Sequence, residues 1–399
     1  LCLWVFKAIT NTKAVIRDQW LVLFFMLMRL YAGSALIIAY ARTQAPRLPG
    51  WALQLAILVF ALASPTPYFL ARPLIYEAAI AAGQAFVFCG LLAAYHGLIE
   101  PRKRTQRFVV AGCCFAAALG SRGSLIIVSP LLIAVTVLAA HRSAGYPKRE
   151  VLRSLIAMGA PVAAALVMYL IYNKVRFDSF GEFGLKYQLT NPPFMSKKRF
   201  ILPNIVSYLT SDVSFSCEFP FARLPTERKL TRLILWPGDY DAGDWERGER
   251  TAGLLIATSI CWLWLVWMWR GARNGLRAYV RPAPITLSTR ELWLLGCAFS
   301  LMLALAPATR MWMANTRFVE DALGGILLGS IAAGFWLIER TRRSSFSITR
   351  ALGPSLYAAF GVHTIVIGVC LGFTGYMDNF GHANPQLFEQ LVHELSFCR

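Results

Sequence analysis

The chain is poor in charged residues, and acidic residues are the scarcest of them. Only 15% of its 399 residues are charged, with 21 Asp and Glu against 40 Lys and Arg. Apolar residues make up 57%, and the mean hydropathy is +0.51. A soluble domain of this length rarely has such a composition, whereas a membrane protein does. The composition therefore argues against a soluble globular protein.

Sequence patterns that bind metal ions are also missing. The nine cysteines form no CxxC pair, and the five histidines form no HExxH or similar motif. We therefore predict no metal and no cofactor from these residues, although a bound phosphate could still recruit a divalent ion through carboxylates. Most of the cysteines lie in apolar runs and are expected to be inert buried thiols. Cys217 and Cys398 are expected on one side of the membrane, where they could pair in an oxidising compartment.

The chain shows no signal peptide, no internal repeat and no low-complexity tract. It begins with Leu1, so we interpret it as a fragment that lacks its true N-terminus. Residues 1–19 carry Lys7, Lys13 and Arg17 among apolar residues. They fit either a helix at the membrane interface or the remnant of an earlier span.

Long apolar runs are what the chain has in abundance. A membrane-spanning helix needs about 20 apolar residues, and ten runs reach or approach this length. They cover residues 20–41, 51–70, 73–98, 107–121, 123–140, 152–172, 251–269, 291–308, 319–338 and 351–373. The sequence thus predicts an all-α fold, a polytopic transmembrane helical bundle of about ten spans. The polar turn at 120–124 favours a hairpin of two spans over one kinked element.

Lys and Arg are concentrated in alternate loops between these runs. Five loops carry them: Arg42 and Arg47; Arg102, Lys103, Arg104 and Arg107; Arg142, Lys148 and Arg149; Arg270, Arg273, Arg277, Arg281 and Arg290; Arg340, Arg342, Arg343 and Arg350. Cytoplasmic loops of membrane proteins carry such an excess, so these loops are predicted to be cytoplasmic. The protein is then a multi-pass integral membrane protein, and a bacterial inner membrane is expected. The same pattern accounts for the net charge of +19 without a nucleic-acid partner.

The loops divide the chain into four expected segments. Transmembrane helices occupy 1–172, with a first span and first outer loop missing before them, and further transmembrane helices occupy 251–373. Between them, 173–250 forms an extracytoplasmic loop or lid, and 374–399 forms an extracytoplasmic tail. The long loop holds many basic residues, but long translocated segments escape the charge rule. Its aromatic and Leu content favours a small ordered subdomain over disorder.

Ionisable and amide side chains gather on the side opposite the basic loops. They are Arg72, Glu77, Arg122, Asn173, Arg176, Glu182, Arg310, Arg317, Glu320 and Asp321. A charge at a membrane boundary is costly unless it is compensated, so such a cluster predicts a binding site. Small neighbours of Arg122, namely Gly120, Ser121, Gly123 and Ser124, would let a lipid phosphate approach its guanidinium group.

Structural interpretations of these residues stay open. Glu77 can cap a helix beside Tyr76 as an interfacial anchor, and Arg122 can extend to the lipid headgroups. Arg317 and Asp321 are spaced i, i+4 and could form a local ion pair. The functional alternative is that Asp321 orients Arg317 toward a phosphate.

Several motifs occur in a recognisable order. The segment 172–189 reads YNKVRFDSFGEFGLKYQL and is similar to the pattern YN-x-x-RFGSP-x-EFG-x-x-YQ. Further matches are Arg72-Pro73 with Tyr76-Glu77, Ser121-Arg122, Asn204-Ile205 with Tyr208-Leu209, Phe219-Pro220-Phe221, and Arg317-Phe318 with Asp321. Together they resemble bacterial membrane proteins of the GT-C glycosyltransferase superfamily, of the family 39 or protein mannosyltransferase-like type. Asp178 and Phe180 depart from the Gly and Pro of the pattern.

The resemblance implies a GT-C-like fold and transfer of a sugar from a polyprenyl-phosphate-linked donor to an acceptor on the extracytoplasmic face. The implied partners are this donor, membrane lipids, and an acceptor glycan, lipid or protein. The implied substrate-binding residues are Arg72, Tyr76, Glu77, Arg122, Asn173, Arg176, Glu182, Tyr187, Gln188, Arg317 and Asp321. The catalytic Asp of such enzymes lies in the first outer loop, upstream of this chain, so no base is nominated. The alternative function is a transporter or lipid flippase with an outward-facing anionic-substrate site.

Overall fold

The apolar runs fold into long helices. The computed structural model describes residues 17–144, 148–182, 198–224, 251–280, 287–311, 314–375 and 379–398. In this part of the chain, seven helices are long and apolar enough to cross a membrane. They are α2 (Asp18–Gln44), α5 (Ile75–Ile99), α7 (Leu125–Ala144), α8 (Lys148–Phe177), α13 (Thr289–Met302) continued by η6 (Leu303–Leu305) and α14 (Ala306–Thr309), α15 (Thr316–Arg342) and α16 (Ser347–Thr374). The protein is a multi-pass helical membrane protein, as predicted.

Two of the ten predicted spans are wrong as continuous helices. The run 51–70 splits into α3 (Gly50–Leu62) and α4 (Thr66–Leu70), because Pro65 and Pro67 cannot continue the helical hydrogen bonding. The run 251–269 splits into α11 (Leu254–Ala257), η5 (Ser259–Leu263) and the start of α12 (Trp264–Val280). The two breaks meet, and the Thr258 hydroxyl donates to the Ser64 carbonyl at 2.9 Å.

The predicted turn at 120–124 does separate two helices, but only the second of them, α7, is among the seven helices long and apolar enough to cross a membrane. After η1 (Pro101–Lys103), α6 (Arg104–Ser121) is followed by its C-cap residue Arg122, and α7 begins at Leu125 on the other side of the turn. Arg122 has an extended backbone with φ −145° and ψ 122°, which stops α6. The helix α6 packs against α5 and α8, so the turn is held at one end of the bundle.

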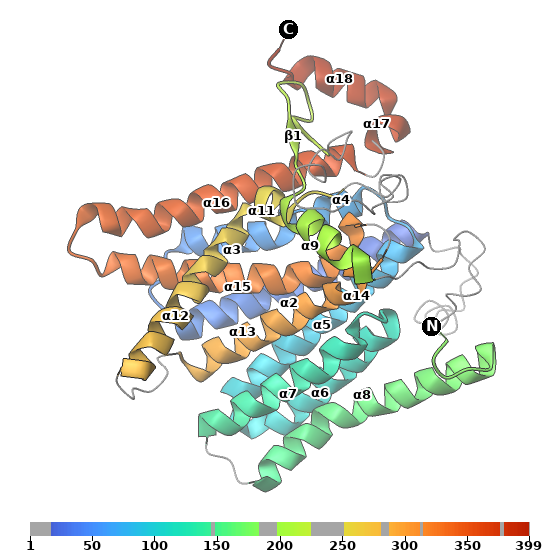
Figure 1. Ribbon diagram of the computed structural model, residues 1–399, viewed down its shortest axis with the longest axis vertical. Helices are drawn as coiled ribbons and strands as arrows, with labels where there is room; N and C mark the ends of the chain where they lie inside the picture. Colours follow the sequence, from blue (N-terminus) through green and yellow to red (C-terminus); the bar gives the residue numbers. More distant parts are fainter. Residues whose placement is uncertain are drawn as a thin grey trace.

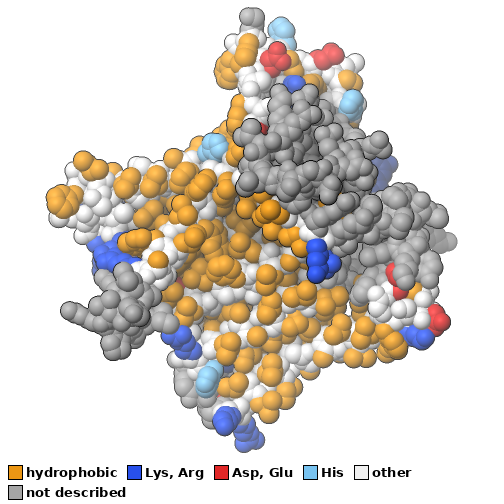
Figure 2. Space-filling model, viewed as in Figure 1, with side chains coloured by type: hydrophobic (Ala, Val, Ile, Leu, Met, Phe, Trp, Pro, Cys, Tyr) orange, Lys and Arg blue, Asp and Glu red, His pale blue; other side chains and the backbone are white. Residues whose placement is uncertain are grey.

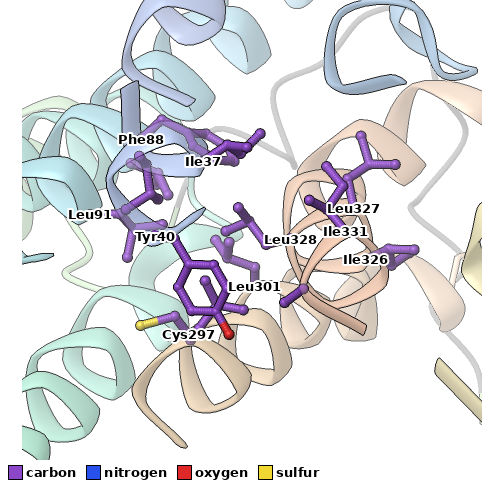
Figure 3. Close-up of a cluster of buried hydrophobic side chains, with 14 of the residues drawn as sticks. Ile37, Tyr40, Phe88, Leu91, Cys297, Leu301, Ile326, Leu327, Leu328 and Ile331 are labelled. Carbon is purple, nitrogen blue, oxygen red and sulfur yellow. The ribbon is translucent and has the colours of Figure 1, made fainter. Parts of the chain in front are cut away.

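Helix α15 lies inside the bundle, between α13 and α16 in Figure 1, and it also contacts α3 and α5. Buried residues make up 89% of its most apolar stretch. Figure 3 shows part of the packing around it, with Leu328 of α15 on the side that faces Leu301 of α13 and Tyr40 of α2. Apolar side chains also cover much of the outer face in Figure 2, as a lipid-exposed protein requires.

The predicted basic loops converge at one end of the bundle. Arg342 donates to the carbonyl of Arg47 at 3.0 Å, and the Arg47 amide donates to Glu339 at 3.2 Å. The Ser288 hydroxyl donates to Gln44 at 2.7 Å, which brings the start of α13 to the end of α2. The opposite end holds the start of α5, the α6–α7 turn and the start of α15. The alternation of basic and non-basic loops in the sequence therefore corresponds to a difference in charge between the two ends of the bundle.

The described part of the long connection is joined to the C-terminal segment. It contains η3 (Lys198–Phe200), α9 (Ile201–Thr210) and the short antiparallel strands β1 (Ser214–Phe215) and β2 (Ala222–Arg223). The C-terminal helices α17 (Asn379–Ala383) and α18 (Pro385–Leu395) lie beside β1 (Figure 1). A disulfide joins Cys217 to Cys398, with Cα atoms 5.6 Å apart, which confirms the alternative in which these cysteines pair.

Two predicted loop residues, Tyr187 and Gln188, lie outside the described residues.

Replacing Gly368 with Ala is expected to destabilise the bundle by about 1–3 kcal/mol. A Cβ at this position of α16 would clash with the Leu62 carbonyl oxygen and lie 2.9 Å from the Ser64 amide nitrogen, at the break between α3 and α4. Gly159 in α8 is the matched control, because a Cβ there meets nothing within 4 Å. Gly159→Ala should be neutral or stabilising, since Ala favours helix more than Gly. Unfolding in detergent measures both; equal behaviour of the two variants would contradict the close approach.

Candidate functional site

The candidate site is built on the first two turns of α15. Asn315 caps this helix, its side chain accepting from the Arg317 amide at 2.9 Å. The Asn315 amide donates to the Tyr208 hydroxyl at 3.2 Å. On the same long connection, Asn204 donates to the carbonyls of Thr309 and Met311 at 2.9 and 2.7 Å. The start of α15 is thus fixed by α9.

Three ion pairs connect this helix start to three other elements. Arg317 Nη1 lies 3.4 Å from Glu77 Oε1 of α5. Asp321 Oδ2 lies 2.8 Å from Arg122 Nη2 and accepts from the Ser124 hydroxyl at 3.0 Å. Glu320 Oε1 lies 3.0 Å from Arg29 Nη1 of α2. Three guanidinium groups and three carboxylates therefore meet in one cluster, whose formal charges balance.

The possible local ion pair between Arg317 and Asp321 is not formed, and Asp321 orients Arg122 and not Arg317. Both residues lie one turn apart on α15, but each finds its partner on another element. The reason is packing: α5 and the α6–α7 turn bring Glu77 and Arg122 to this part of α15, where each pairs across the helix interface. Interhelix pairs hold the bundle end together in a way that a pair within α15 would not.

Arg29 is the member of the cluster that the sequence reasoning missed. Its side chain is 2% exposed and that of Glu320 is 0% exposed. Arg29 also donates to the Thr66 hydroxyl at 3.1 Å, and its guanidinium carbon lies 4.8 Å from the centre of the Phe60 ring. A single Arg inside the apolar run 20–41 was the available signal, because an intramembrane charge implies a partner.

Arg122 and Arg317 are the two cluster members whose side chains are partly exposed, at 17% and 19%. The Arg122 guanidinium carbon lies 5.9 Å from the centre of the Phe318 ring. A Cβ on either flanking glycine, Gly120 or Gly123, would meet nothing within 4 Å. The turn is therefore unobstructed on its outer side, as the small residues in its sequence predicted.

Several buried polar atoms of the cluster make no hydrogen bond with the described residues. They are Glu77 Oε2, Asp321 Oδ1, Arg122 Nε, Asn315 Nδ2, Gln84 Oε1, Arg29 Nε and Arg29 Nη2. Most buried polar atoms in proteins have a partner, so each such atom needs an explanation. Here they surround one helix start at a membrane boundary, where a polar ligand or ordered water would satisfy them.

Other predicted site residues lie apart from these ion pairs. Tyr76 is 58% exposed. Asn173 is buried and donates to the Phe180 carbonyl at 3.3 Å, while Arg176 is exposed, donates to the Tyr172 hydroxyl and lies over the Phe177 ring. These contacts form a local group at the end of α8. Asp178, which replaces the glycine of the sequence pattern, has a positive φ of 53°. Asp tolerates this conformation better than most residues, so the turn survives the departure.

Arg72 and Glu182, two further predicted site residues, are each partly buried. Arg310 is exposed. No group of three or more His, Cys, Asp or Glu side chains that could hold a metal ion occurs within the described ranges.

Comparison with known proteins gives one distant similarity in structure. No protein-family model matches the sequence, and no curated protein matches it. Among solved structures, the chain is similar to the Archaeoglobus fulgidus oligosaccharyltransferase in its apo form, with a TM-score of 0.47 and 14% sequence identity. The match covers 89% of this chain and 45% of that chain, so this chain spans less than half the length of that protein. A similarity at this level is too distant to assign a function.

Proposed function

We propose that this chain belongs to a GT-C-like membrane glycosyltransferase that moves a sugar from a polyprenyl-phosphate-linked donor to an acceptor on the extracytoplasmic face. The observation that carries the proposal is the ion-pair cluster at the start of α15. It brings Glu77, Arg122, Arg317 and Asp321 together, and these residues belong to three separate motifs of the sequence resemblance. Motifs far apart in sequence that meet in space are expected of a substrate site.

A lipid-linked sugar phosphate has an anionic head and a long apolar tail. It needs cations at the membrane boundary with apolar helix surface below them. Arg122 and Arg317 meet the first requirement, since both lie at helix starts or turns and are 17% and 19% exposed. Guanidinium groups bind phosphate in a bidentate geometry, and the unpartnered Arg122 Nε is available for a second hydrogen bond.

The carboxylates of the cluster have a positioning role in this proposal. Glu77 and Asp321 are 1% and 2% exposed, and each holds one guanidinium group through a single oxygen. They keep the two Arg side chains ordered before the donor arrives, which lowers the entropy cost of binding. The sugar-transfer step itself needs a carboxylate to accept the proton of the acceptor. Because Asp321 is occupied by Arg122 and Ser124, we do not assign that role within this chain.

A transporter is the second candidate, and the broken helices favour it. Transporter sites often lie where two discontinuous helices meet, as α3–α4 and α11–η5 do at Ser64 and Thr258. The polar groups at this junction are satisfied within the protein, however. Thr364 accepts from the Ile260 amide at 3.0 Å, and the Ser259 hydroxyl contacts His363 Nδ1 at 3.0 Å. A junction with its polar groups already paired is better explained as structural.

Reconstituted vesicles distinguish the two functions. The protein as it occurs in the cell is placed in vesicles with polyprenyl-phosphate-linked sugars and candidate acceptors. The glycosyltransferase proposal predicts a new glycosidic product that depends on the donor. Movement of a solute or lipid across the vesicle membrane with no glycosidic product would replace it with the transporter function.

Cysteine labelling tests which side of the membrane carries the site. Single cysteines at Ser124 and Glu182 are expected to react with an impermeant reagent from outside, and one at Ser345 from inside. The reason is the positive charge of the loops at the Ser345 end, which are predicted to be cytoplasmic. Reversed accessibility at these three positions would place the cluster on the cytoplasmic side and contradict an extracytoplasmic reaction.

A further inference from the structure

A cavity lies at the end of the bundle opposite the ion-pair cluster, between the ends of α2, α5 and α7 and the start of α13. Its volume is about 290 Å³, and it is lined by Gln44, Leu98, Ala139, Arg142, Ser288, Thr289 and Arg290. Glu77 and Leu98 are separated by roughly 30 Å along α5, at about 1.5 Å per residue. The cavity is therefore a membrane thickness away from the α15 cluster and is independent of the proposed function.

The cavity has cations and no acidic residue in its lining. Arg142 and Arg290 form no ion pair with the described residues, whereas the nearest acids along the chain have their own cations. Glu291 lies 3.0 Å from Arg270, and Glu100 lies 3.5 Å from Arg107. The sequence adds that no Asp or Glu occurs at 101–149 or 250–290. The loops next to the cavity thus supply no acid to neutralise it.

The same cavity has an apolar side, and an exposed apolar residue of α7 lies next to it in the sequence. Leu98 and Ala139 form this side, and the neighbouring Leu138 is 66% exposed. Two unpaired guanidinium groups above an apolar helix surface are suited to a molecule with an anionic head and acyl chains. A soluble anion would use the Arg residues and leave the apolar side unused.

We infer that this cavity binds the phosphate headgroup of an anionic phospholipid, with its acyl chains along α7. Arg142 and Arg290 would contact the phosphate oxygens, and Gln44 and Thr289 would lie beside the glycerol. Basic pockets between transmembrane helices recognise anionic headgroups in this way, and each basic residue near the surface contributes to the selectivity. The phospholipid would then connect the ends of α7 and α13, which come from distant parts of the chain.

Lipid binding to the purified full chain tests this inference. Native mass spectrometry in detergent compares phosphatidylglycerol, phosphatidylcholine and inorganic phosphate as probes. The wild type is expected to bind phosphatidylglycerol more tightly than phosphatidylcholine. In the double variant Arg142→Gln/Arg290→Gln, the ratio of the two affinities is expected to fall about tenfold. Arg142→Lys/Arg290→Lys keeps the charges and should retain most of it.

The control is Arg343→Gln/Arg350→Gln, which removes two positive charges from the end of α15 and the first turn of α16, at the same end of the bundle. It should keep the wild-type preference. The inference is overturned if this control loses as much as the cavity variant, since the effect would then be net charge. An unchanged preference in Arg142→Gln/Arg290→Gln overturns it as well. Binding of inorganic phosphate without phosphatidylglycerol would assign the cavity to a soluble anion instead.

Discussion

Glu320→Ala is expected to destabilise the folded protein by about 3–5 kcal/mol, because it leaves a buried charge without its partner. Glu320 and Arg29 are 0% and 2% exposed, and the two groups lie 3.0 Å apart. Without the carboxylate, the Arg29 guanidinium keeps, among the described residues, its contacts with Thr66 and the rings of Phe60 and Phe88. Equilibrium unfolding of the purified protein in detergent or bilayers measures the change in free energy.

Two controls separate the loss of a partner from the loss of a side chain. Arg29→Met/Glu320→Leu removes both charges and fills similar volume, so it should recover most of the stability. Glu150→Ala removes an exposed acid of α8 whose contact with Arg153 is 3.8 Å long, and it should cost little. A loss of less than 1 kcal/mol for Glu320→Ala, on the order of a surface pair, would contradict the burial of this ion pair.

Arg122→Ala and Arg317→Ala are expected to weaken donor binding at least about tenfold, since a hydrogen bond to a charged group contributes roughly 1.5–3 kcal/mol. Both variants should reduce donor affinity by more than their loss of folding stability can explain. The reason is that both side chains are partly exposed at the end of the bundle where the phosphate would lie, and Arg122 Nε has no hydrogen-bond partner among the described residues. Titration with a polyprenyl-phosphate-linked sugar, alongside unfolding of each variant, gives the two quantities.

Arg122→Lys helps to interpret this result. Lys keeps the charge beside Asp321 but cannot form a bidentate contact with phosphate. It should therefore preserve most of the stability and give an intermediate donor affinity. Arg153→Ala, at an exposed position of α8, is a control for the loss of one positive charge. Parallel losses of affinity and stability in Arg122→Ala and Arg317→Ala would show that these residues only hold the bundle together.

The helices of this protein were largely predictable because their physical cause is local. A run such as 20–41 or 319–338 is apolar over the length of a span, and it forms one helix in the structure. The basic loops were predictable for a similar reason, since alternate loops share one end whenever the runs between them cross the bundle. The prediction was wrong where hydropathy and backbone chemistry disagreed. At 51–70 the run is apolar throughout, but Pro65 and Pro67 break the helix.

Four members of the ion-pair cluster were predictable from the sequence, but its pairing was not. Glu77, Arg122, Arg317 and Asp321 were singled out because they are charged and lie at the predicted outer ends of the spans. In the structure these residues do come together. Their partners depend on which helices pack side by side, and spacing along one helix does not contain that information. Arg29 shows the same limit, because its partner Glu320 lies far away in the sequence. A lone charge in a span predicts that a partner exists, and only the fold identifies it.

A photoactivatable polyprenyl phosphate tests the central claim most directly, because it reports where the anionic lipid binds. The full protein in membranes is irradiated with this probe, and the crosslinked peptides are identified by mass spectrometry. We predict crosslinks to the α6–α7 turn around Arg122 and to the start of α15 around Arg317, with fewer in Arg122→Ala. Crosslinks confined to the basic end of the bundle, or spread evenly over the lipid-facing helices, would contradict a donor site at the ion-pair cluster.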